Sequence, residues 1–260
     1  MKPLRELPAA GVEGLFFDID DTLTSHGRLT PEAYAALSRW KDAGRVAVPI
    51  TGRPAGWCDH IARMWPVDAV VGENGAFYFR YDAARRQLHK RFLVDAATRV
   101  ANRERLAVVR ERILKEVPGC APASDQAYRE ADLAIDFCED VPALPLQAAE
   151  RIAALMQGAG MTARISSIHV NGWFGDYDKL GMTRLLAAEA LGLELDAARA
   201  RFVFVGDSPN DAPMFAYFPA SVGVANVLRF ESLLAAKPAY VTRGEAGRGF
   251  VELVDHLLAG

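Results

Sequence analysis

The sequence predicts an α/β fold, a doubly wound parallel sheet with a second, α+β domain inserted into it. Short apolar runs at 15–17, 45–50 and 69–71 are separated by helical patterns. This rhythm stops after residue 75 and returns at Asp178. Because a strand–helix–strand rhythm is typical of parallel sheets with right-handed crossovers, we expect both ends of the chain to build one core.

The first segment is expected to place a helix after each of its first two strands. Thr30 suits an N-cap, and Pro31 suits the first position of a helix that runs to about Gly44, since glycine favours a helix C-terminus. A second helix carries Trp57 and Met64 and leads into the third strand.

The middle of the chain has helices and short strands in a different order. The expected elements are a hairpin over 76–80 and 87–92, a helix over 96–117, a strand over 133–137, a helix over 145–157, and strands near 162–166 and 168–173. The long helix is indicated by apolar positions that recur on one face. We interpret this stretch as an inserted domain with an antiparallel sheet of its own.

From Asp178 onward, helices and strands alternate again. The expected elements are a helix from Lys179, a strand over 201–206, a helix from Ser208, strands over 221–225 and 239–242, and a helix over 249–258. The strand over 201–206 ends in Asp207, as the first strand ends in Asp18. A carboxylate at the end of an apolar strand cannot stay buried without a partner, so both should emerge at the sheet edge.

The composition is that of an ordinary globular protein, with 260 residues, of which 51% are hydrophobic and 24% charged, and a net charge of −3. It gives no indication of a nucleic-acid or membrane-surface partner, and no apolar run approaches the ~18 residues of a membrane span. The first residues lack the apolar core of a signal peptide. Three widely spaced cysteines fit a reducing compartment, and no Cys or His pair has zinc-ligand spacing. We therefore expect a cytoplasmic monomer or homodimer.

An acidic motif, Asp18-Ile19-Asp20-Asp21-Thr22, directly follows the first apolar run. Side chains two residues apart on an extended chain point the same way, so Asp18 and Asp20 should lie together. Two neighbouring carboxylates repel unless a cation or a proton lies between them. Mg²⁺ held by carboxylates and a substrate phosphate would remove the repulsion, and a solvated acidic turn is the alternative.

Other polar residues should reach the same edge of the sheet. Thr51 ends the second strand, and Lys179 and Asp211 lie at helix starts. Because ligands of open parallel sheets bind beyond the carboxyl ends of the strands, these residues should converge with Asp18 and Asp207. Carboxylates could hold Mg²⁺ or attack phosphorus, and Lys179 could bind phosphate oxygens. Taken alone, each residue could equally be a helix cap or a solvated side chain. Their occurrence together, in this order along the chain, favours phosphate binding and phosphoryl transfer.

Four motifs together resemble those of the haloacid dehalogenase superfamily of phosphohydrolases. They are Asp18-Ile19-Asp20-Asp21-Thr22, Ile50-Thr51-Gly52-Arg53, Asp178-Lys179 and Gly206-Asp207-Ser208-Pro209-Asn210-Asp211. The resemblance implies that Asp18 is the nucleophile and Asp20 the general acid/base. It further implies phosphate binding by Thr51, Gly52, Lys179 and Asn210, Mg²⁺ binding by Asp18, Asp207 and the backbone carbonyl of Asp20, and a supporting role for Asp211. The superfamily's dehalogenases lack an acid/base residue like Asp20, so its presence favours phosphate chemistry.

The sequence is more closely similar to the Cof-like (subclass IIB) group, whose C2-type cap is inserted after the third strand. The stretches that carry this similarity are 71–76, 222–226 and 236–242, and 208–213 is similar to mannosyl-3-phosphoglycerate and sucrose-phosphate phosphatases. Lys179 is followed by Leu180-Gly181, where many members have glycine directly after the lysine. On this basis we expect residues 1–91 and 175–260 to form the core and residues 92–174 the cap, and these two names are used below.

The resemblance implies a Mg²⁺-dependent phosphatase that acts through an aspartyl-phosphate on a small metabolite, a sugar phosphate or a phosphoglycerate derivative. A phosphotransferase or phosphomutase on the same fold is the first alternative, and a non-catalytic binding protein is the second. The intact set of acidic residues and Lys179 argues against the second. For some residues both a structural role and a substrate-binding role are open. They are Arg53, Glu73 and Asn74 near the strand ends, and Arg129 and Arg164 in the cap. We expect Trp57, Trp65 and Trp173 to pack in the core or between the domains.

Overall fold

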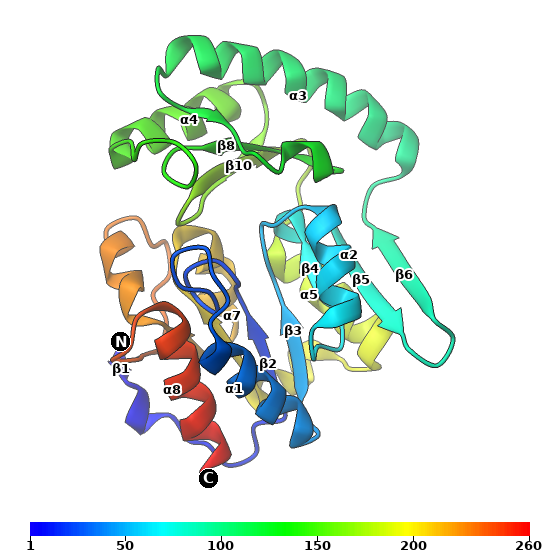
Figure 1. Ribbon diagram of the computed structural model, residues 1–260, viewed down its shortest axis with the longest axis vertical. Coiled ribbons are helices and arrows are strands. Elements are labelled where there is room, and N and C mark those ends of the chain that lie inside the picture. The colour runs from blue at the N-terminus through cyan, green and yellow to red at the C-terminus, as the bar shows by residue number, and fades with distance from the viewer.

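Six parallel strands form the central sheet of the computed structural model, which describes residues 1–260 (Figure 1). The order across the sheet is β1 (Lys2–Pro3), β13 (Tyr240–Val241), β12 (Ala220–Gly223), β11 (Phe202–Gly206), β2 (Gly14–Phe17) and β3 (Val46–Pro49). The strands from the two ends of the chain therefore pair directly, since β11 lies beside β2. This arrangement confirms the predicted doubly wound α/β core.

Helices cover both faces of this sheet because side chains of β2 alternate between them. The helices of the core are α1 (Pro31–Asp42), α2 (Ala55–Met64), α5 (Lys179–Leu191), α6 (Leu195–Ala198), α7 (Ala212–Tyr217) and α8 (Ala246–Leu258). Leu15 and Phe17 pack against α1 and α8 on one face. Phe16 packs against α5 and α7 on the other.

A hairpin extends the sheet beyond β3. Ile50 and Val71 form a parallel bridge that brings β4 (Val70–Gly72) alongside, and β5 (Phe77–Asp82) and β6 (Gln87–Phe92) follow in antiparallel pairing. Helix α2 packs on this extension through its apolar face. The predicted hairpin is thus confirmed, and it leads the chain toward the cap.

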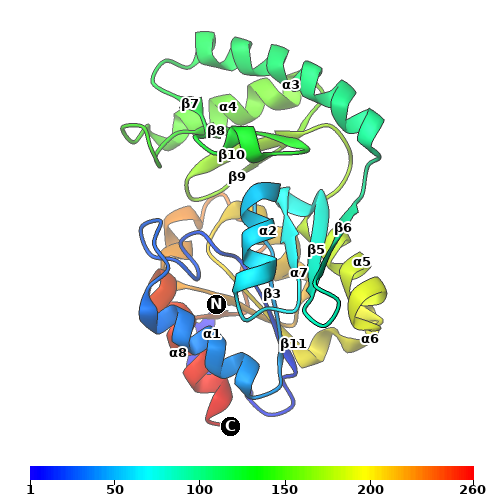
Figure 2. The same ribbon diagram turned by 45° about the vertical axis from the view of Figure 1, so that its right-hand side comes forward.

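The cap has a four-stranded antiparallel sheet with two helices on the side away from the core (Figures 1 and 2). Its strands in spatial order are β7 (Ala121–Pro122), β8 (Asp132–Asp136), β10 (His169–Trp173) and β9 (Thr162–Ile165), and its helices are α3 (Ala96–Glu116) and α4 (Leu146–Gly158). The side chains between the helices and the sheet form a separate apolar cluster. The antiparallel sheet expected in this stretch is confirmed; the domain boundaries at 91/92 and 174/175 stay a prediction.

Some local details differ from the expectations. Helix α8 begins at Ala246 and not near residue 249, because Gly247 and Gly249 weaken its helical pattern. Gly249 is needed there, since a Cβ atom would lie 2.4 Å from the Gly244 carbonyl oxygen. The two-residue strands β1 and β7 have no periodicity to predict them. Short 3-10 turns are η1 (Leu4–Glu6), η2 (Glu73–Gly75), η3 (Gln126–Tyr128), η4 (Arg199–Arg201), η5 (Pro209–Asp211) and η6 (Ala225–Phe230).

Trp173 lies between cap and core, as the expectation of interdomain packing requires. Its ring is fully buried, and its Nε1 donates to the Tyr177 carbonyl oxygen at 3.1 Å. Trp57 differs, because its side chain stays largely exposed beside Arg53. None of the helices combines the length and apolarity needed to span a membrane.

Candidate active site

Three adjacent strands end at the same edge of the sheet, directly below the cap (Figure 1). Asp18 follows β2, Thr51 follows β3 after one residue, and Asp207 follows β11. All three side chains are buried. The structure therefore brings together residues that are up to 189 positions apart in the sequence, as the parallel topology requires.

A buried lysine joins two of the carboxylates. Lys179 Nζ lies 2.6 Å from Asp18 Oδ1 and 2.7 Å from Asp211 Oδ1, and we call these three residues the lysine cluster. Burial raises the pKa of Asp18 to about 8, although Lys179 acts in the opposite direction. Burial alone would lower the pKa of Lys179, but Asp18 and Asp211 raise it overall. The lysine is thus held charged and points at the carboxylate expected to be the nucleophile.

Asp211 also fixes the loop that carries Asp207. Its Oδ2 accepts the backbone N–H groups of Asp207 at 3.1 Å and Ser208 at 3.3 Å. This approach requires glycine at position 206, since a Cβ atom there would lie 2.3 Å from the same oxygen. Asp211 therefore positions both Lys179 and Asp207.

The donor set at this edge fits a hard divalent cation. Carboxylate oxygens of Asp18, Asp207 and Asp211 all lie within 4.8 Å of one another. Asp207 Oδ1 is buried without any hydrogen-bond partner, and burial next to Asp18 raises the pKa of Asp207 well above its usual range. Both oxygens of Asp211 are engaged, Oδ1 by Lys179 and Oδ2 by backbone N–H groups, whereas Lys179 takes only one oxygen of Asp18. Asp18 and Asp207 are therefore the carboxylates that could hold Mg²⁺. The carboxylate of Asp20 is not part of this group; the ligand expected from that residue is its backbone carbonyl.

The Asp20 side chain instead pairs with Arg53. Arg53 Nε lies 2.9 and 3.0 Å from the two Asp20 oxygens, Nη2 lies 2.5 Å from Glu139 Oε1, and Nη1 lies 3.2 Å from Asp125 Oδ2. We call Asp20, Arg53, Asp125 and Glu139 the arginine cluster. Its first two members belong to the core and the other two to the cap. The guanidinium also stacks over the Trp57 ring at 4.3 Å.

The phosphate-binding candidates of the second motif lie between these clusters. Thr51 Oγ1 accepts the backbone N–H of Arg53 at 3.0 Å, which fixes the turn after β3. The backbone N–H groups of Ile19, Asp20 and Gly52 donate no hydrogen bond within the protein. Unpaired N–H groups gathered at a sheet edge are suited to an anion.

Asn74 and Asn210 meet across the site. Asn210 Nδ2 donates to Asn74 Oδ1 at 3.2 Å, and Asn74 Nδ2 is buried without a partner. Asn74 and its neighbour Glu73 both have positive φ, at 54° and 42°. Such backbone conformations are uncommon outside glycine and are typical of functional turns. The two amides are therefore placed beside the phosphate-binding candidates.

Glu73 anchors the cap to the core, a role that sequence reasoning did not find. Its buried carboxylate accepts the backbone N–H groups of cap residues Glu130, Ala131 and Asp132 at 2.9, 2.6 and 3.2 Å. It also accepts the N–H of Ala55 at the start of α2. The turn that carries Glu73 thus joins the cap to the edge of the active site.

For the cap arginines both a structural and a substrate-binding explanation were open. Arg129 is buried between Asp125 and Asp132, and its Nη1 donates to the Gly52 carbonyl oxygen at 2.8 Å. Its charge is already neutralised, so the structural explanation holds for this residue. Arg164 donates to the neighbouring Ala163 carbonyl and lies outside the cavity described next.

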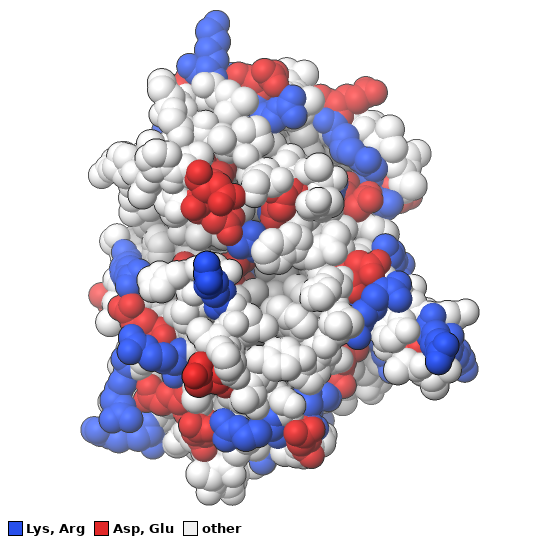
Figure 3. Space-filling model, viewed as in Figure 1, with Lys and Arg blue, Asp and Glu red and all other residues white.

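A cavity of about 390 Å³ lies between core and cap above the arginine cluster. Its lining residues include Asp20, Asp21, His26 and Arg53 from the core and Cys138, Glu139, Ser167 and Ile168 from the cap. In Figure 3, acidic side chains lie along the lower border of the cap, where the surface is hollowed between cap and core. We call this cavity the chamber. Its position beside Asp20 makes it the space available to the part of a substrate beyond the phosphate.

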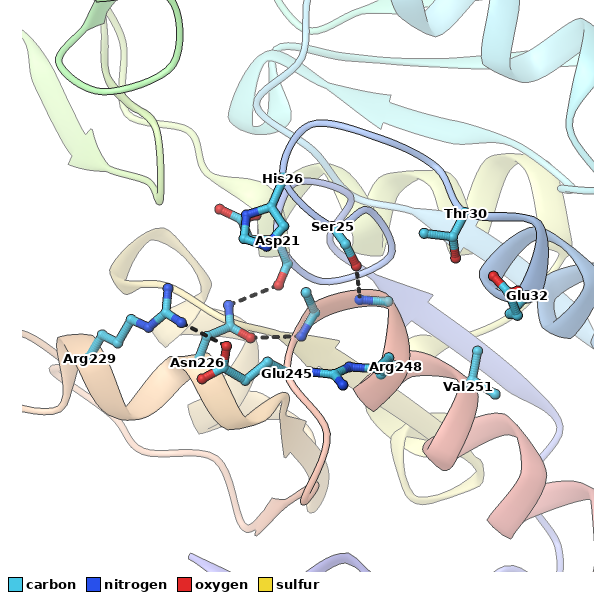
Figure 4. A pocket seen from close by; sticks show the side chains of 12 residues that line it. Asp21, Ser25, His26, Thr30, Glu32, Asn226, Arg229, Glu245, Arg248 and Val251 are labelled. Carbon is cyan, nitrogen blue, oxygen red and sulfur yellow. Dashed lines mark hydrogen bonds and ion pairs between the residues drawn. The ribbon is translucent and has the colours of Figure 1, made fainter. Parts of the chain in front are cut away.

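Asn226 was also missed as a site residue. Its Nδ2 donates to Asp207 Oδ2 and to the Asp21 carbonyl oxygen, both at 2.9 Å, and its Oδ1 accepts the Ala246 N–H. Figure 4 shows Asn226 in the wall of a second pocket, between the loop of Asp21 and the start of α8. Asn226 thereby fixes one oxygen of Asp207 and leaves the other, Oδ1, without a partner. An asparagine in a turn gives no sequence signal for such a role.

Known proteins resemble the chain over nearly its whole length. A phosphoglycolate phosphatase from Pyrobaculum neutrophilum is 32% identical over 254 residues, which cover 96% of this chain and 97% of the relative. The sucrose-phosphatase of Synechocystis sp. PCC6803, solved with sucrose and phosphate, has a TM-score of 0.60 at 17% identity and covers 94% of this chain and 97% of its own. A subclass IIB sugar phosphatase gives the same TM-score at 14% identity, with coverage of 94% and 98%. At these identities the two structures show a shared fold.

The family assignment rests on a match along both core and cap. The family model of the haloacid dehalogenase-like hydrolases matches residues 12–218, which include all four motifs. The match confirms the superfamily that the four motifs indicated. This protein belongs to the haloacid dehalogenase-like hydrolases.

Proposed function

We propose that the protein is a Mg²⁺-dependent phosphatase that hydrolyses a small phosphorylated metabolite through a phosphorylated Asp18. The observation that carries this proposal is the pairing of Asp18 with Lys179 beside a buried, unpartnered oxygen of Asp207. One carboxylate is thus presented to a phosphate with a fixed cation next to it, and a second is left free for a metal. The family match and the phosphatase relative support the same class of reaction.

In the first step Asp18 attacks phosphorus with the oxygen that faces the substrate. Lys179 neutralises phosphate oxygens, and the free N–H groups of Ile19, Asp20 and Gly52 are placed to donate to them. When bound to Asp18, Asp207 and the Asp20 carbonyl, Mg²⁺ supplies further neutralisation of charge on the phosphoryl group. The product of this step is an aspartyl-phosphate and the released alcohol.

Asp20 is proposed to act as general acid in the first step and as general base in the second. It donates a proton to the leaving alkoxide and then removes one from the water that attacks the aspartyl-phosphate. Arg53 holds both oxygens of Asp20 on the chamber side, where the leaving group must lie. The side chains of Asp18 and Asp20 therefore have different partners and different proposed roles, although they are two residues apart.

The cap, taken as residues 92–174, is proposed to close over the bound substrate and exclude water. The arginine cluster and the Glu73 anchor support this idea, because both join cap residues to the active-site edge. Candidate substrates are phosphoglycolate, from the name of the relative, and sugar phosphates or phosphoglycerate derivatives, from the resemblance.

The test is a screen of phosphorylated metabolites for phosphate release, with Mg²⁺, by the wild-type protein and by Asp18→Asn. We expect release from a narrow set of small esters and none above background from the variant. Equal release by both proteins would contradict the proposal, because phosphate release would then not depend on Asp18.

A further inference from the structure

The guanidinium of Arg53 has no hydrogen-bond donor left for a substrate. Its nitrogens face carboxylate oxygens of Asp20, Glu139 and Asp125, and Trp57 covers one face of the group. A carboxylate from the cap thus occupies the side of Arg53 on which an anionic substrate group would otherwise bind. Arg53 is the one cation whose side chain lies buried in the chamber wall.

The other charges around the chamber are mostly negative. Asp20, Asp21 and Glu139 line it, and the basic residues besides Arg53 are His26 and, at the rim, Arg229. Arg229 is paired with Glu245 at 2.7 Å, and Figure 4 shows this pair at the second pocket. The chamber therefore presents carboxylate oxygens, and both of its arginines are already paired with carboxylates.

Glu139 is held in place by the cap itself. Asp136 Oδ1 accepts the backbone N–H groups of Cys138 at 2.9 Å and of Glu139 at 2.8 Å, and Oδ2 accepts that of Asp140 at 2.8 Å. His169 Nε2 lies 2.9 Å from Glu139 Oε2, an oxygen that also faces Arg53 Nη1 at 3.4 Å. The loop after β8 thus delivers a fixed carboxylate to the chamber, and Glu139 is not a mobile surface residue.

We propose that Glu139 is a specificity residue that makes the chamber select an uncharged, hydroxyl-bearing leaving group and reject one that carries a carboxylate. The inference rests on the proposed phosphatase function and chooses between its candidate substrates. It favours the phosphate ester of a polyol or a sugar over that of a hydroxy acid.

The physical reason is the balance of donors and acceptors in the chamber. Hydroxyl groups can donate to the carboxylate of Glu139, whose pKa is lowered mainly by its hydrogen bonds to His169 and Arg53 and which as an ionised group only accepts. The Ser167 hydroxyl, which is buried without a partner, can pair with a further oxygen of the ligand. A substrate carboxylate would lie among like charges, and it could reach Arg53 only by displacing Glu139 and leaving that carboxylate unpaired.

The experiment compares two esters that differ in charge and hardly in size, 2-hydroxyethyl phosphate and phosphoglycolate. The ratio of their kcat/KM values is measured for the wild type, for Glu139→Gln and for Asp140→Asn. The last variant removes the same charge from the same loop at an exposed position, so it controls for the overall charge of the cap. Thermal unfolding and phosphate release from an aryl phosphate check that each variant is folded.

We expect the wild type to prefer the hydroxyethyl ester by about tenfold or more, as one like-charge contact at a partly buried site would produce. Glu139→Gln should reduce this preference at least tenfold, mainly through a lower KM for phosphoglycolate, and Asp140→Asn should leave it unchanged. A wild-type preference for phosphoglycolate would overturn the inference even if Glu139→Gln did not fold. A ratio that is equal in all three proteins would also overturn it. If no ester, including the aryl phosphate, releases phosphate, the proposed function itself fails and the inference with it.

Discussion

The lysine cluster and the arginine cluster lie at the same sheet edge and are built differently. The lysine cluster, Asp18, Lys179 and Asp211, comes from the core alone, and all of its side chains are buried. The arginine cluster needs Asp125 and Glu139 from the cap to surround Arg53. Glu139 stays partly exposed, with 21% of its side-chain surface accessible.

This difference separates the attack on phosphorus from the control of the leaving group. We expect the lysine cluster to keep its geometry whether or not the cap is closed, because the hydrogen bonds of Lys179 Nζ go to core residues alone. Arg53, and through it Asp20, is fully surrounded only when the cap lies on the core. We therefore expect substitutions in the two clusters to affect different substrates by different amounts.

Removal of the metal should have the largest effect of all. EDTA should abolish phosphate release from every substrate, since Asp18 and Asp207 would be left as neighbouring unneutralised carboxylates. Added Mg²⁺ should restore activity, and Ca²⁺ should do so poorly because it prefers more ligands at longer distances. Full activity of the chelator-treated protein would refute the proposed metal-binding role of Asp18 and Asp207.

Lys179→Met should reduce kcat by about 10³-fold with aryl and alkyl phosphates alike, because a fixed cation at the transferring phosphoryl group is lost in both cases. Lys237→Met is the matched control, since that exposed lysine pairs with the exposed Glu231 and with no residue of the four motifs. The measurement is steady-state phosphate release with each ester. A loss confined to alkyl phosphates would show that Lys179 acts on the leaving group. The lysine cluster and the arginine cluster would then not differ in the step that they control.

Arg53→Gln should have a smaller and selective effect. An alkyl ester, which needs a proton for its leaving group, should lose about tenfold to a hundredfold in kcat, whereas an aryl ester should lose much less. Arg63→Gln, on the exposed side of α2, is the control. Equal losses with both esters would mean that Arg53 serves the phosphoryl group and not Asp20.

Asn226→Ala should have the mildest effect on turnover. Without the hydrogen bond to Asp207 Oδ2, the free oxygen of Asp207 is less well oriented, so about 10- to 100-fold more Mg²⁺ should be needed for half-maximal activity. The rate at saturating Mg²⁺ should stay near that of the wild type. An unchanged Mg²⁺ requirement would exclude this orienting role.

The same two clusters show what the sequence can predict. Asp18, Thr51 and Asp207 each follow an apolar run, and parallel topology brings such strand ends together, so their convergence could be expected. The fold class and the antiparallel sheet of the cap also followed from periodicity and order.

The contacts between cap and core could not be predicted in this way. Glu73 and Glu139 have no periodic context, and their partners lie 57 to 86 residues away along the chain. Their roles depend on how one folded layer sits on another, which no local pattern encodes. For Arg129 the sequence left a structural and a substrate-binding explanation open, and only the folded structure, which buries it between two carboxylates, decides for the first.

The central claim, that Asp18 carries the phosphoryl group while Asp20 moves protons, is tested most directly with Asp20→Asn. An aryl phosphate, whose phenolate leaves without a proton, should still phosphorylate Asp18, but the second step lacks its base. Rapid-quench mass spectrometry should show the intact protein heavier by one phosphoryl group, together with a burst of at most one phenolate per site. An alkyl ester should give no burst. Steady turnover of both esters without a phosphorylated protein, or a phosphoryl group that persists in Asp18→Asn, would contradict the account.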